Sequence, residues 1–161
     1  MEKYQTFGRR FGAAILDSII IFPVNWIVSS VILSITAIPT MLSWAIPALI
    51  SALYYILLHY YFGQTLGKIA ARVKVLDDSG TSINFGQSII RSLPQLIIPM
   101  FAVSFSTADQ TAADTIRLWA GIIYGFNFLF SVANIIVCLA NEKRRALHDF
   151  IAGTIVVRTD V

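Results

Sequence analysis

RRFGAAILDSIIIF, residues 9–22, places two arginines at the start of an apolar run and an aspartate, Asp17, inside that run. Asp17 follows Arg10 by seven residues, which is about two helical turns and about 10 Å along the axis. Both side chains would therefore lie on one helix face. With Arg10 among lipid headgroups, an ionised Asp17 inside the hydrocarbon layer costs on the order of 3 kcal/mol. The stretch thus predicts a membrane helix whose buried acid needs a partner or a proton.

The whole chain has the composition of an integral membrane protein. Of its 161 residues, 57% are hydrophobic and 13% are charged, and the mean hydropathy is +0.73. Soluble domains carry about 25% charged residues. The apolar excess lies in four segments close to or above the roughly 20 residues that cross a bilayer as a helix, namely residues 11–38, 41–62, 89–106 and 118–140. The sequence predicts a single all-α polytopic membrane domain, residues 1–161, whose first helix is too long for a cleavable signal peptide.

The basic residues predict the orientation of these helices. All but Arg117 fall before the first segment, between the second and third segments or at the start of the third, where Arg91 lies, or after the fourth. Cytoplasmic loops are rich in lysine and arginine, so both termini, the connection 63–88 and the tail 141–161 are expected in the cytoplasm. An alternative with three spans, in which the segment containing Pro94 and Pro99 does not cross, would carry the tail to the other side.

The connection 63–88 differs from the apolar segments around it. Gly63 and Gly67 are expected to end the second helix and turn the chain. VKVL and TSINF then flank DDSG, a turn signal, which predicts a short cytoplasmic β-hairpin. The β-branched stretch GTIVVR, residues 153–158, can add a further strand to this hairpin.

Three parts of the chain together resemble the RDD family of small bacterial membrane proteins, named for one arginine and two aspartates. These parts are the opening segment 10–17, the stretch GQTLGKIAARVKVLDDSGTSINFGQSIIRSL and the closing stretch RRALHDFIAGTIVVR. The resemblance places the family's arginine on Arg10 and its aspartates on Asp17 and Asp149. It implies a function in the bacterial cytoplasmic membrane, often described as transport, with sodium/proton antiport attributed to some relatives.

Two roles are open for Asp17. It binds a cation or proton that crosses the bilayer, as acids within membrane segments often do, or it is a structural acid that hydrogen-bonds a neighbouring helix. We expect Arg10, Asp17 and Asp149 to converge at the cytoplasmic membrane boundary, because each lies at or just inside that leaflet. The other members expected in this boundary cluster are basic or titratable: Arg91, Arg72, Lys68 and His148.

Polar residues also recur on single faces of the apolar segments. They are Asn127, Ser131 and Asn134 in the last segment, Ser51 and His59 in the second, and Asn25 in the first. Such stripes line a pathway in some membrane proteins, but more often they hydrogen-bond neighbouring helices.

The sequence offers no pattern for catalysis, a metal or another cofactor. His148 and Asp149 are adjacent, so they point apart on a helix, and no nucleophile motif accompanies them. Two histidines and one cysteine form neither a convincing zinc site nor a disulfide framework. GQTLGK lacks the spacing of a phosphate loop. The net charge of +3 follows from membrane orientation, so we expect no nucleic-acid partner.

Two functions therefore stay open. The first is transport of a small cation or proton by a homo-oligomer. An oligomer is expected because four helices leave little room for two gates in one chain, and a dimer would be parallel because the charge bias fixes one insertion direction. The second is a non-transporting module that binds lipid or a partner protein through its basic cytoplasmic face. In both cases the bilayer and its anionic headgroups are expected partners.

Overall fold

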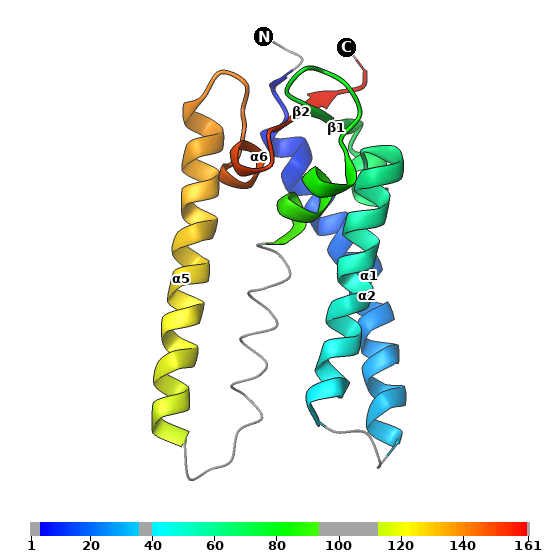
Figure 1. Ribbon diagram of the computed structural model, residues 1–161, viewed down its shortest axis with the longest axis vertical. Coiled ribbons are helices and arrows are strands. Elements are labelled where there is room, and N and C mark those ends of the chain that lie inside the picture. Colours follow the sequence, from blue (N-terminus) through cyan, green and yellow to red (C-terminus); the bar gives the residue numbers. More distant parts are fainter. Residues whose placement is uncertain (1–3, 36–39, 94–112, 161) are drawn as a thin grey trace.

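Three long helices run along the molecule and carry a small cap at one end (Figure 1). The computed structural model describes residues 4–35, 40–93 and 113–160. The long helices are α1 (Phe7–Ser34), α2 (Thr40–Phe62) and α5 (Ala113–Ala140). The cap consists of residues 63–93 and 141–160. The first and last described residues lie at the cap end, where the Arg9 guanidinium donates to the Asp160 carboxylate over 2.8 Å.

Helices α1 and α2 are long and apolar enough to cross a membrane. They contain 28 and 23 residues, so each exceeds the ~30 Å hydrocarbon layer at about 1.5 Å per residue. Only 11% of either candidate span is buried within the protein. Phe22 is 72% exposed and Trp26 is 65% exposed. These helices are therefore not the core of a soluble domain, and their surfaces suit contact with lipid.

The structure does not show that the remaining two predicted segments cross a membrane. Helix α5 has 28 residues and includes the predicted segment 118–140, and its stretch Phe128–Ala140 is a shorter apolar helix. The predicted segment 89–106 lies mostly outside the described residues. Its described part, residues 89–93, belongs to a helix over residues 85–93. Four spans therefore stay a prediction.

Gly63 ends α2, as the sequence predicts. Its φ of 67° lies in the left-handed region, and its amide donates to the His59 carbonyl over 2.9 Å. A Cβ at this position would lie 2.7 Å from the Val75 carbonyl oxygen. The chain can therefore turn tightly from α2 into the cap only with glycine here.

The cap contains a two-stranded antiparallel sheet of β1 (Val73–Asp77) and β2 (Thr154–Arg158). Val75 lies opposite Val156 in its register. Val73, Val75 and Val156 are fully buried and pack together with Ile83. The two strands are distant in sequence, so their pairing joins the C-terminal stretch to the connection between α2 and residues 85–93.

The predicted hairpin within residues 63–88 is wrong, although its turn is present. The Gly80 amide donates to the Asp77 carbonyl over 2.8 Å, so DDSG does reverse the chain. The next residues are not a strand, because Asn84 caps the helix over residues 85–93. The Asn84 side chain accepts from the Gln87 amide over 2.8 Å, and the Gln87 side chain accepts from the Asn84 amide over 3.0 Å. This reciprocal capping box favours a helix start, so β1 pairs with β2 instead.

Candidate functional site

Asp17 is buried at 2% exposure where α1 meets α2 and the first turn of the cap. The Tyr54 hydroxyl and the Gly67 amide each donate to its Oδ1 over 2.8 Å. The Thr65 hydroxyl donates to its Oδ2 over 2.6 Å. Both carboxylate oxygens are thus bound by neutral donors from α2 and from the chain around α3 (Leu66–Ala70). Among the described residues, no basic side chain lies within ion-pair distance of Asp17.

Thr65 and Gly67 reach Asp17 because α3 begins directly against α1. Thr65 is the N-cap of α3, and its hydroxyl accepts from the Lys68 amide over 3.3 Å. Gly67 lies so close to α1 that a Cβ would be 2.2 Å from the Ala13 carbonyl oxygen. In the short sequence TLG, Thr65 supplies a hydroxyl and the N-cap of α3, and Gly67 supplies a close backbone contact with α1. Together these groups enclose the Asp17 carboxylate.

Asp149 forms a second buried carboxylate site, separate from the first. It lies in α6 (Leu147–Ile151) and is fully buried. Arg10 Nη1 donates to its Oδ2 over 2.7 Å, and Arg91 Nη1 donates to its Oδ1. The Ala146 amide also donates to Oδ2, over 2.9 Å. Asp149 therefore links α6 to α1 and to the helix over residues 85–93.

The charges around Asp149 decide its protonation. Burial alone would raise the pKa of the carboxyl, but the charges of Arg91 and Arg10 outweigh burial and hold this pKa well below its usual range. Burial lowers the pKa of the neighbouring His148 to about 3, so its imidazole is neutral at pH 7. His148 Nδ1 donates to Asn134 Oδ1 over 2.9 Å. Asp149 is thus an ionised carboxylate that is neutralised by arginine.

A comparison with protein families assigns the chain to a family. The family model described as "RDD family" matches residues 4–153. The chain belongs to the RDD family. No curated protein and no solved structure gave a significant match. The protein is thus an RDD family membrane protein with apolar helices. Its Arg10 and Asp149, two of the three residues that the resemblance singles out, are in direct contact.

Asp17, the third of these residues in the RDD protein, does not join that contact. The Arg10 guanidinium turns towards α6, whereas Asp17 faces α2 and α3, so the two residues have separate partners and their convergence at the membrane boundary stays a prediction. Arg72 is also absent from the cluster. Its side chain is exposed, its φ is 56°, and within the described ranges it forms no ion pair with Asp149. Lys68 contacts His59 rather than a carboxylate.

The predicted polar faces mostly make contacts between elements. Asn25 of α1 donates to the Ser51 hydroxyl of α2 over 2.8 Å, so these two side chains join the helices. Asn134 binds His148, and Ser131 is exposed. The side chain of Asn127 lies outside the described residues. The described part of these faces therefore resembles interhelical hydrogen bonding more than a conduction route.

Two residues of the Asp17 site were not singled out in the sequence. Tyr54 is one position away from Tyr55, which lies on the helix face of Ser51 and His59, and nothing in the sequence distinguishes the two tyrosines. Thr65 did carry a signal, because a threonine directly before LGKIA is a typical N-cap. Recognising that short helix would have placed Thr65 and Gly67 on one turn.

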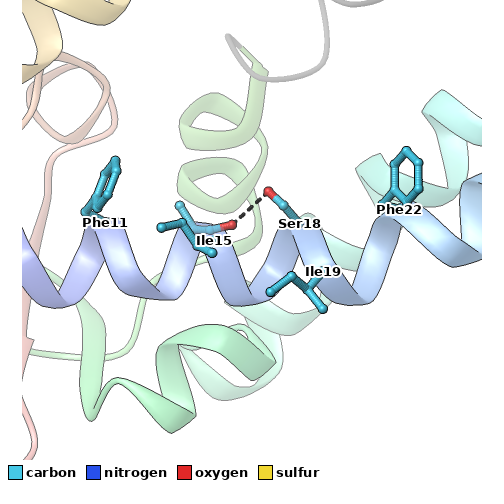
Figure 2. A pocket seen from close by; sticks show the side chains of 6 residues that line it. Phe11, Ile15, Ser18, Ile19 and Phe22 are labelled. Carbon is cyan, nitrogen blue, oxygen red and sulfur yellow. Dashed lines mark hydrogen bonds between the residues drawn. The ribbon is translucent and has the colours of Figure 1, made fainter.

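An apolar groove of about 450 Å³ follows the outer face of α1 but does not reach either carboxylate. Figure 2 shows Phe11 and Phe22 at its two ends and Ile15, Ser18 and Ile19 between them. The Ser18 hydroxyl, the only polar side-chain group in this lining, donates back to the Ala14 carbonyl over 2.8 Å. The groove therefore presents an apolar surface that suits lipid contact.

Proposed function

We propose that this RDD family protein moves a proton or small cation across the bacterial cytoplasmic membrane, with Asp17 as the ion-binding carboxylate. The observation that supports this proposal is the environment of Asp17, which is buried and, within the part of the chain that the structure describes, accepts hydrogen bonds from neutral donors alone. A buried carboxylate with no basic partner among the described residues carries a negative charge that a bound cation can balance. Asp149 differs, because two arginines already neutralise it.

The proposal includes four spans with both termini and residues 63–88 in the cytoplasm, and a parallel homo-oligomer. The distribution of basic residues supports this orientation. Single cysteines at Ser79 and Thr107, in a Cys138→Ser background, test it with a membrane-impermeant reagent. Ser79→Cys should react only from the cytoplasmic side, and Thr107→Cys only from the outside. Labelling of both positions from one side contradicts four spans.

Flux through proteoliposomes tests the role of Asp17. Asp17→Asn removes the charge at nearly constant volume, and its amide oxygen can still accept from Tyr54 and Gly67. We expect this variant to remain folded and to lose sodium-, potassium- or proton-driven flux. Asp78→Asn is the matched control, because Asp78 is an exposed carboxylate paired with Lys143 and should leave flux unchanged. Unchanged flux in Asp17→Asn contradicts the proposal.

A second candidate function is a non-transporting module that binds anionic lipid through the cap. The exposed Arg72 and the Lys143 side chain, which is 48% exposed, favour it. No flux in a well-folded wild type, together with stronger thermal stabilisation by phosphatidylglycerol than by phosphatidylcholine, would support this function instead. Arg72→Gln should then weaken the effect of phosphatidylglycerol.

A further inference from the structure

Lys68 lies in the cap between the two carboxylate sites but forms an ion pair with neither of them. Its Nζ lies at hydrogen-bond distance from His59 Nε2, at the end of α2. Within residues 4–35, 40–93 and 113–160, no carboxylate lies within ion-pair distance of this amine. A lysine that is partly buried and bound to a second base lacks the usual counter-charge of a buried ammonium.

The surrounding charges make a further positive charge unfavourable. Arg10 and Arg91 share the single negative charge of Asp149, so this group is already net positive before Lys68 is counted. Protonation of both Lys68 and His59 would also place two like charges at hydrogen-bond distance. The charged or titratable groups that act on Lys68 or its partner come from every neighbouring element, namely Arg10 and Asp17 of α1, Arg91 of segment 85–93, and His148 and Asp149 of α6.

We propose that Lys68 and His59 form a second proton-binding site, which holds at most one exchangeable proton, and that its occupancy is coupled to the charge on Asp17. In the occupied form the Lys68 ammonium donates to the neutral His59 ring, and in the empty form both groups are neutral. The coupling rests on the proposed function, since Lys68 and His59 would hold the proton that exchanges against a cation bound at Asp17.

Electrostatics support both parts of the inference. Burial lowers the pKa of Lys68 well below its ordinary value, the charges of Arg91 and Arg10 lower it further, and the charges of Asp149 and Asp17 act in the opposite direction. Neutralisation of Asp17 by a cation would therefore weaken proton binding at Lys68. Binding linkage is reciprocal, so proton uptake at Lys68 would weaken cation binding at Asp17.

Lysine-selective ¹⁵N labelling tests the site, because the chain contains only four lysines: Lys3, Lys68, Lys74 and Lys143. The Nζ resonances of the full chain in nanodiscs are followed against pH, and Lys68→Arg identifies the Lys68 signal. We expect this signal to titrate well below the other three. His59→Leu should lower its midpoint further, because the variant removes the acceptor of the ammonium. Titration of Lys68 together with the other three lysines overturns the proposal, whatever the flux measurements show.

Sodium tests the coupling separately. In the wild type, sodium chloride should lower the Lys68 midpoint relative to an equal concentration of choline chloride, and Asp17→Asn should abolish this difference. A low midpoint without any sodium response leaves the proton site standing and overturns the coupling. Flux in that case decides the proposed function independently, because transport is measured without reference to Lys68.

Discussion

The Gly67 amide donates to Asp17 Oδ1 over 2.8 Å, and the same glycine leaves no space for a side chain against α1. A Cβ at Gly67 would lie 2.2 Å from the Ala13 carbonyl oxygen and 2.9 Å from Asp17 Cγ. Backbone and carboxylate therefore meet at one point, and α3 can dock on α1 only while residue 67 has no Cβ.

Gly67→Ala should destabilise the protein by about 1–3 kcal/mol, because the new methyl group forces α3 away from α1 and stretches the bonds to Asp17. Thermal unfolding in detergent measures this change. Gly12→Ala is the control, since nothing lies within 4 Å of a Cβ there and alanine favours a helix interior by up to ~1 kcal/mol. Equal stability of Gly67→Ala and the wild type would show that α3 does not pack on Ala13.

The sequence predicted the apolar helices and the proximity of Arg10 and Asp149, but not the partners of Asp17. Apolar length and charge spacing are properties of a single segment, so they can be read locally. The choice between Tyr54 and Tyr55 depends on how α2 is rotated against α1, because neighbouring residues point in directions about 100° apart on a helix. Only packing between the helices determines that rotation.

The cap shows the same limit for charged and β-branched residues. Arg91 reaches Asp149 and Arg72 does not, because the capping box at Asn84 and Gln87 starts a helix that carries Arg91 inward. Local pattern made TSINF the expected partner of β1, whereas the actual partner is distant in sequence. Residues 154–157 are all buried, and such a continuous buried run is typical of a strand covered on both faces.

Asp149→Asn should destabilise the protein by about 3–5 kcal/mol, because it leaves two buried guanidinium groups without their shared anion. The variant keeps the shape of the side chain, so lost charge is the main change. Thermal unfolding compares it with Asp160→Asn, which removes an ion pair at the surface with Arg9 and should change stability little. Similar losses of stability in both variants would contradict the larger contribution expected from the buried ion pairs of Asp149.

The stability of the protein should fall as the pH is lowered from 7 to 5, and His148 should contribute to this loss. Its folded pKa is about 3, whereas a histidine in the unfolded chain titrates near 6.5. Between these values the unfolded chain binds a proton that the folded protein does not, so acid favours unfolding. One such proton contributes a slope of up to ~1.4 kcal/mol per pH unit.

His148→Gln isolates this contribution. Glutamine does not titrate, and its amide can still donate to Asn134. We therefore expect a shallower dependence of the melting temperature on pH over the same range. Asp149 does not confound the comparison, because its lowered pKa keeps it ionised throughout. An identical slope in the variant and the wild type would mean that His148 accepts its proton without loss of the fold.

The pairing of β1 with β2 predicts which engineered cysteines form a disulfide. Val75 and Val156 are direct partners in the register, and facing residues of an antiparallel pair lie within the Cα separation that a disulfide needs. In a Cys138→Ser background the chain has no other cysteine, so Val75→Cys with Val156→Cys should cross-link under mild oxidation. The control is Val75→Cys with Ser82→Cys, the pair that a hairpin around DDSG would place opposite one another. Alkylation followed by mass spectrometry measures both reactions. Faster cross-linking of the control pair would favour the hairpin over the pairing of β1 with β2.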